Sequence, residues 1–141
     1  MVNLVKELNV KDLFFVGGKH WKGVPIYYAL SDVFVLLSIS EPWGLVVNEA
    51  MVCDLPVIVS NRAGAAYGLV REGENGFVFD PFNEQDLLEK MSFFVKNPYK
   101  IKEIGKCSKK IIAEYTPEKA AYQMLKGICG ILNKGSDSYV K

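Results

Sequence analysis

Residues 32–60, DVFVLLSISEPWGLVVNEAMVCDLPVIVS, decide the fold, because they read as strand, helix and strand in succession. The runs DVFVLLS (32–38) and LPVIVS (55–60) are short, apolar and rich in Val and Ile, which is typical of buried strands. Between them, GLVVNEAMVC (44–53) has the length and composition of a helix. Buried strands joined by a helix predict a parallel sheet that is covered on both faces.

The same alternation continues on either side of this unit. Two further strands are predicted, at LFFVGG (13–18) and NGFVFD (75–80). Helical segments are predicted between the strands at 24–31 and, as a shorter piece, at 65–73. After the sheet, helices are predicted at 83–97, 99–115 and 116–134, with Asn83 and Thr116 as N-caps and Pro117 at the first helical position.

These elements predict an α/β domain over residues 1–134, followed by a frayed tail at 135–141. Its fold class is a partial doubly wound, Rossmann-like parallel sheet of about four strands with C-terminal helices.

Composition narrows the classes of function. The chain has 141 residues, 50% of them hydrophobic, which suits one globular domain with a core. A net charge of +1 argues against a nucleic-acid partner. Cys53, Cys107 and Cys129 form no CxxC pair, so we interpret them as reduced thiols of a cytoplasmic protein. No apolar run approaches the roughly 20 residues that span a bilayer, so no transmembrane segment is expected.

Two glutamates, Glu41 and Glu49, stand on either side of a helix start. Glu41 follows a strand and is expected at the carboxyl end of the sheet, where open parallel sheets form their ligand crevice. The helix that begins near Gly44 or Leu45 presents unpaired amides there, which suit a phosphate. Glu49 lies about 6 Å along the helix axis from Leu45, comparable with the separation of phosphate and ribose in a nucleotide. These residues therefore predict a nucleotide site.

A purely structural interpretation stays open for the same residues. Glu41 could be only a partner of the helix dipole, and Glu49 could be a buried carboxylate paired with Arg62 or Arg71. A glycine such as Gly64, in the loop after 55–60, often serves only its conformational freedom. The single histidine, His20, is likewise more often incidental than a ligand contact.

Residues 27–79 resemble the donor-binding domain of the group 1 retaining glycosyltransferases, and the similarity runs from about residue 5 to about residue 132. Its centre is the paired-glutamate pattern E-x7-E of that family, matched here by Glu41 and Glu49. SDVFVLLS precedes this pattern, and DLPVI and NGFVF follow it. Leu37 and Asp54 depart from the family, which usually has proline and glycine there. Asp tolerates the left-handed conformation, so Asp54 is interpreted as a helix cap.

The resemblance implies a GT-B donor domain with Glu41 as the catalytic residue, against the transferred sugar. It implies that Glu49 holds the ribose, that the amides from Trp43 to Leu45 hold sugar hydroxyls and phosphate, and that the loop GGKHW lies near the base. The nucleotide-sugar-binding residues so implied are Trp43, Gly44, Leu45, Glu49, Gly64 and Gly18. Such enzymes need no obligatory metal, and no Asp-x-Asp stands in this chain. No cofactor is expected.

The chain begins in what resembles the helix before the third strand of that domain. Two strands, which carry an arginine and a lysine that clamp the diphosphate, and the acceptor domain are then missing. The function expected is the donor-site portion of a retaining glycosyltransferase, inactive as this chain alone. The alternative is a non-catalytic nucleotide-sugar-binding or assembly module. A dinucleotide enzyme is disfavoured, because no G-x-G-x-x-G follows a strand. The sequence names neither donor nor acceptor.

The missing strands also raise a question about the sheet edge. In family order they lie between 13–18 and 32–38, so the inner edge of 32–38 would be apolar and unpaired, an arrangement prone to aggregation. We expect one of two repairs. Either residues 13–18 slide inward and pair with 32–38, or a second chain covers the edge, as an acceptor-domain partner or through self-association.

Overall fold

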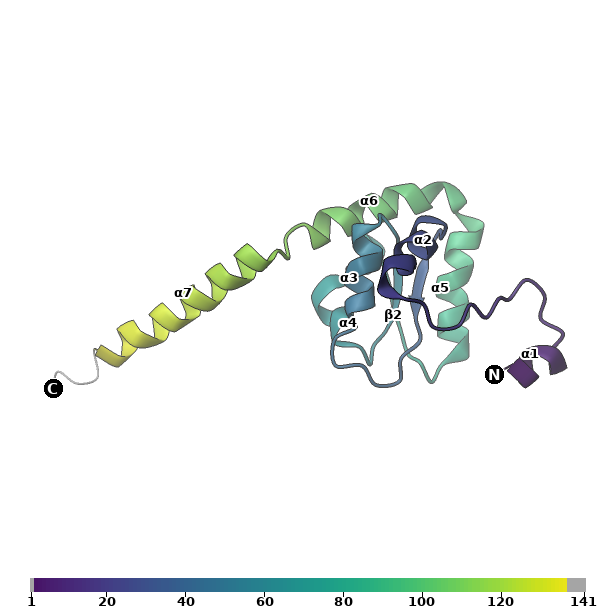
Figure 1. Ribbon diagram of the computed structural model, residues 1–141, viewed down its shortest axis with the longest axis horizontal. Helices are drawn as coiled ribbons and strands as arrows, with labels where there is room; N and C mark the ends of the chain where they lie inside the picture. Colours follow the sequence, from purple (N-terminus) through teal and green to yellow (C-terminus); the bar gives the residue numbers. More distant parts are fainter. Residues whose placement is uncertain (1, 137–141) are drawn as a thin grey trace.

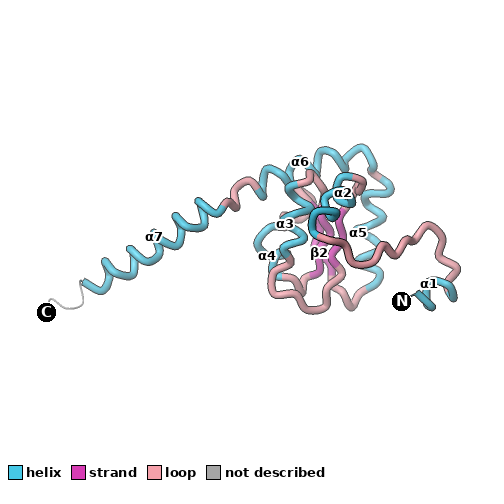
Figure 2. Tube along the Cα trace, viewed as in Figure 1, coloured by secondary structure: helices cyan, strands magenta, loops and turns pink. Residues whose placement is uncertain are grey.

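A parallel sheet of three strands lies at the centre of the computed structural model, which describes residues 2–136 (Figure 2). The strands are β1 (Phe34–Leu36), β2 (Val57–Ser60) and β3 (Gly76–Phe79), in the order β1-β2-β3. In the register of the sheet, Val35 is opposite Ile58, and Ile58 is opposite Phe77. The predicted α/β class with a parallel sheet is confirmed.

Helices cover both faces of this sheet, while the first and the last helix of the described chain lie away from it (Figure 1). Their bounds are α1 (Val2–Glu7), η1 (Trp21–Gly23), α2 (Val24–Ala29), α3 (Leu45–Val52), α4 (Gly64–Leu69), α5 (Glu84–Lys96), η2 (Pro98–Lys100), α6 (Ile101–Ile112) and α7 (Pro117–Ser136). The predicted caps are confirmed: the side chain of Asn83 accepts the amide of Asp86 at 3.2 Å, and that of Thr116 accepts the amide of Lys119 at 3.2 Å. Helix α7 continues two residues into the segment expected as a tail, and residues 137–141 lie outside the described chain.

Alternation along the strands divides the core into two clusters. Val57 and Val59 of β2 face a cluster with Met51 of α3 and Leu69 of α4, whereas Ile58 faces a cluster with Phe94 of α5. Helix α6 contributes to both clusters, through Ile111 and Ile112 on one side and Ile104 on the other. All four residues of β2 are buried, as expected for a strand covered on both faces.

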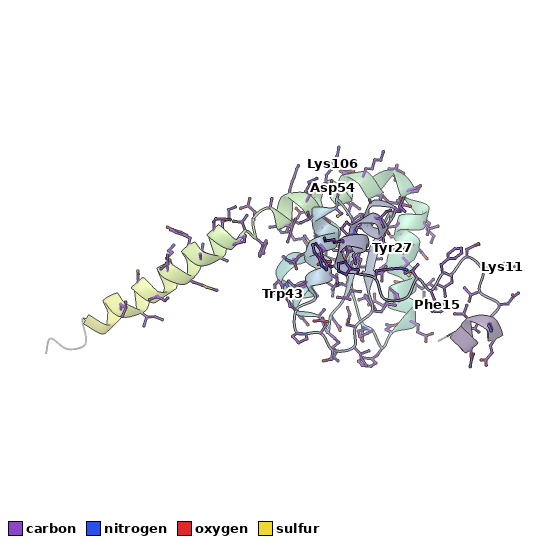
Figure 3. All side chains as sticks on the ribbon, viewed as in Figure 1. Lys11, Phe15, Tyr27, Trp43, Asp54 and Lys106 are labelled. Atoms are coloured by element: carbon purple, nitrogen blue, oxygen red, sulfur yellow. The ribbon has the colours of Figure 1, made fainter. Side chains whose placement is uncertain are left out.

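The predicted strand at 13–18 is wrong. These residues form no β-structure, and they lie exposed between α1 and η1, with the side chain of Phe14 80% exposed. Figure 3 shows Phe15 on this segment, leading from α1 to the body of the molecule. The sheet instead ends at β1, whose outer edge pairs with no strand among residues 2–136. The expected inward slide of 13–18 onto β1 is therefore also wrong.

Helix α7 projects away from the body (Figure 1). Its apolar residues recur at helical spacing and are exposed: Met124, Leu125, Ile128, Ile131 and Leu132. Within residues 2–136, no helix combines the length and apolar character needed to cross a membrane. Cys53, Cys107 and Cys129 form no disulfide within residues 2–136.

Candidate functional site

The loops that follow β1 and β2 meet at the carboxyl edge of the sheet. Glu41 and Ala63 form a parallel bridge, in which the amide of Glu41 donates to the carbonyl of Arg62 at 3.1 Å. The amide of Gly64 donates in turn to the carbonyl of Glu41 at 3.2 Å. A Cβ on Gly64 would lie 2.3 Å from the carbonyl oxygen of Pro42, so this close approach requires glycine. The two loops therefore meet at one rim, with Gly64 next to Glu41.

The start of α3 lies beside Glu41. Gly44 precedes the helix in the left-handed region, with φ of 94°, and supplies no capping side chain. The carboxylate of Glu41 accepts the amide of Trp43 at 3.3 Å. The amides of Gly44, Leu45 and Val46 have no partner among residues 2–136. Three free donors and the positive end of the helix dipole thus lie next to a carboxylate.

Glu49, one turn into α3, is held by a tyrosine and not by an arginine. The hydroxyl of Tyr28 in α2 donates to Glu49 Oε2 at 2.9 Å. Burial of Tyr28, then its hydrogen bond to Glu49 and the charge of that carboxylate, raise the pKa of the phenol well above its usual value. Glu49 itself is exposed, while Arg71 pairs with Glu74 at 3.4 Å. The interpretation of Glu49 as a buried carboxylate in an ion pair is therefore wrong.

Glu49 and Tyr28 line a pocket of about 430 Å³ between α2 and α3. Trp21 of η1 and Asn48 of α3 also line it. The indole nitrogen of Trp43 donates to Asn48 Oδ1 at 3.0 Å, so hydrogen bonds through Trp43 and Asn48 connect the rim at Glu41 with this pocket. Glu41 itself is outside the pocket lining. A larger hollow of about 800 Å³ lies where α7 leaves the body, and none of the predicted site residues lines it.

Two residues considered from the sequence do not join this arrangement. Gly18 is exposed, and a Cβ built on it would meet no atom within 4 Å. The ring nitrogen Nδ1 of His20 accepts the amide of Lys22 at 3.4 Å, and the ring lies near Trp21. The segment GGKHW therefore reaches the pocket through Trp21. Among the described residues, no three His, Cys, Asp or Glu side chains gather as a metal site.

Trp21 belongs to the segment GGKHW that was expected near the base, whereas Tyr28 and Asn48, which also line the pocket, were not among the predicted site residues. The i, i+4 spacing of Val24 and Tyr28 is the signal that places Tyr28 on the inner face of a helix. Its hydroxyl contact with Glu49, 21 positions away, has no counterpart in local sequence.

Comparison with known proteins shows which proteins this chain is similar to. The family model described as glycosyl transferases group 1 matches residues 1–111. Spore coat protein SA of Bacillus subtilis is 36% identical over 91 residues, covering 63% of this chain and 24% of that protein. Sulfoquinovosyl transferase SQD2 of Arabidopsis thaliana is 37% identical over 91 residues, covering 62% of this chain and 18% of that protein.

The fold has close neighbours among solved structures. The structure of sucrose-phosphate synthase from Thermosynechococcus elongatus aligns with a TM-score of 0.78 at 30% identity, over 94% of this chain and 34% of that one. The chain thus spans about a third or less of the proteins that it resembles here. Since the family model covers most of the sequence, the chain belongs to the glycosyl transferases group 1 family.

Proposed function

We propose that this chain carries the donor site of a retaining glycosyltransferase, which moves a sugar from a nucleotide-sugar to an acceptor. The observation that carries the proposal is the start of α3, where Glu41 lies beside the free amides of Gly44 and Leu45 and Glu49 follows at the edge of a pocket. In this proposal Glu41 faces the transferred sugar, the amides hold the diphosphate and Glu49 accepts the ribose hydroxyls.

The proposed chemistry is transfer with retention of configuration at the sugar. The acceptor hydroxyl attacks from the face that the diphosphate leaves, the bond from the anomeric carbon to the phosphate oxygen breaks, and the departing phosphate takes the acceptor proton. Negative charge then develops on the diphosphate, which the amides of Gly44, Leu45 and Val46 would stabilise without reorganising. This electrostatic contribution is the main one that the described residues offer.

The pocket beside Glu49 supports a nucleoside as occupant. It is lined by the carboxylate of Glu49, the amide side chain of Asn48 and the ring of Trp21, which is 72% exposed. An exposed indole suits stacking with a base, and a carboxylate suits two vicinal hydroxyls. Gly18 is proposed to act only through its backbone, in the same segment as Trp21.

The deciding experiment is a binding panel by ligand-observed NMR with UDP-, GDP- and ADP-sugars. At least one is expected to bind, and Glu49→Ala should weaken the corresponding nucleoside diphosphate about tenfold, but its 2′-deoxy form much less. Glu89→Ala is the matched control, because Glu89 is an exposed helical glutamate of α5 whose carboxylate accepts a hydrogen bond from Gln85 on the same helix. Absence of binding across the panel would exclude the proposed donor site.

A further inference from the structure

Tyr28 is the one buried residue of η1 and α2, and it makes two contacts of different kinds. Its ring, 8% exposed, packs edge-on against Phe34 of β1 with the ring centroids 5.9 Å apart. Its hydroxyl reaches across to α3 and donates to Glu49 Oε2 at 2.9 Å. The ring therefore anchors α2 to the sheet, while the hydroxyl ties α2 to a side chain of the proposed site.

Glu49 needs such a tie because, within residues 2–136, the hydroxyl of Tyr28 is the one hydrogen-bond donor to its carboxylate. An exposed glutamate samples several rotamers, and fixing them on binding a ligand costs conformational free energy. Tyr28 is bonded to Oε2 alone, so Oε1 remains open to an incoming hydroxyl. The donor is also firmly placed, because the phenol belongs to a buried ring in contact with β1.

We propose that Tyr28 is a positioning residue for Glu49: its hydroxyl holds one carboxylate oxygen so that the other meets the ribose hydroxyls of the bound nucleotide. This inference rests on the proposed function, in which Glu49 binds the ribose. It adds that preference for a ribonucleotide is set by a residue of α2 that does not itself contact the ribose. The raised pKa of the phenol fits this role, because Tyr28 stays a neutral donor while Glu49 accepts.

The test compares UDP with 2′-deoxy-UDP, and likewise the GDP and ADP pairs, in titrations of the 141-residue chain. Tyr28→Phe keeps the ring against Phe34 and removes the hydroxyl, so it should lower the preference for the ribonucleotide about threefold to tenfold. In a chain that already carries Glu49→Gln, Tyr28→Phe should lower the preference for the ribonucleotide little further, because the hydrogen bond between residues 28 and 49 is already altered. Tyr115→Phe is the control, because the hydroxyl of Tyr115 donates to the carbonyl of Gly68, away from this pocket.

A second variant separates the hydrogen bond from packing. Tyr28→Leu also lacks the hydroxyl, so it should show the same reduced preference, together with a lower melting temperature from the lost ring contact. If Tyr28→Phe leaves the preference unchanged while Glu49→Gln lowers it, the positioning role is wrong and the proposed site of Glu49 stands. If Glu49→Gln also leaves the preference unchanged, or no nucleotide binds, both are overturned.

Discussion

Asn75, just before β3, is a fully buried side chain that organises the turn around it. Its Oδ1 accepts the amide of Arg71 at 2.7 Å, and its Nδ2 donates to the carbonyl of Leu69 at 3.1 Å. Asn75→Ala removes both hydrogen bonds and leaves the two backbone groups without a partner, so we expect the free energy of unfolding to fall by about 3 kcal/mol in chemical denaturation. Gln85→Ala, on the exposed face of α5, is the control and should change it by less than about 0.5 kcal/mol. Equal stability of the two variants would contradict this role.

For individual residues, the sequence predicted some conformations and positions correctly but did not reveal which side chains contact each other. Asp54 was expected in a left-handed cap, and its φ of 60° confirms this. This conformation could be predicted because it depends only on the immediate neighbours of Asp54. The place of Glu41 at the carboxyl end of the sheet was likewise predicted, because Glu41 follows a strand in the sequence. The partner of Glu49 was not, because Tyr28 is brought to it only by the packing of α2 on β1 and α3.

The element scale shows why one apolar run became a strand and another did not. Residues 13–18 (LFFVGG) and 55–60 (LPVIVS) are both short apolar runs, yet only the second contains a strand, β2, which lies between two pairing partners. The first run pairs with no strand in this chain, although the outer edge of β1 has no partner among residues 2–136, and its side chains stay in solvent. Composition measures the preference of a segment for extended backbone, whereas a strand also needs a neighbour in the right place.

The contact between the two rim loops gives a prediction for α4. Gly64→Ala would press a methyl group against the carbonyl of Pro42, so the loops must separate, at a cost of about 1–3 kcal/mol. We expect a lower melting temperature and weaker nucleotide binding, measured by thermal shift with and without ligand. Gly127→Ala in α7 is the matched control, because a Cβ there meets open space and alanine favours a helix. If both variants behave like the parent chain, the close approach is not required.

For the whole molecule, the share of its relatives' length that the chain covers bears on whether it can transfer a sugar. It covers 34% of the sucrose-phosphate synthase chain that it resembles, and the outer edge of β1 pairs with no strand among the described residues. Transfer requires an acceptor aligned with the donor and shielded from water. We therefore expect no sugar transfer by the purified 141-residue chain in a radiolabelled-donor assay, even where the NMR panel detects binding. Turnover that follows the chain through purification, free of host transferases, would refute this.

The open edge of β1 leads to a prediction about association. Beyond β1 no strand pairs within residues 2–136, while the apolar segment 13–18 of the same chain lies exposed. Unpaired edges of this kind recruit strands from other chains. We expect two copies to associate, with 13–18 of one pairing along β1 of the other, which is the second of the repairs expected from the sequence.

Size-exclusion chromatography with light scattering checks this over a range of protein concentrations. Phe14→Lys with Val16→Lys should shift the chain toward monomer and leave its melting temperature unchanged, because both side chains are already exposed. Ile131→Lys is the matched control, since it places the same charge on the exposed stripe of α7 instead. If only the α7 change disperses the oligomer, the interface lies on that helix. A parent chain that stays monomeric at high concentration would contradict the predicted association. It would indicate that β1, with only three residues, is too short a strand to pair with a second chain.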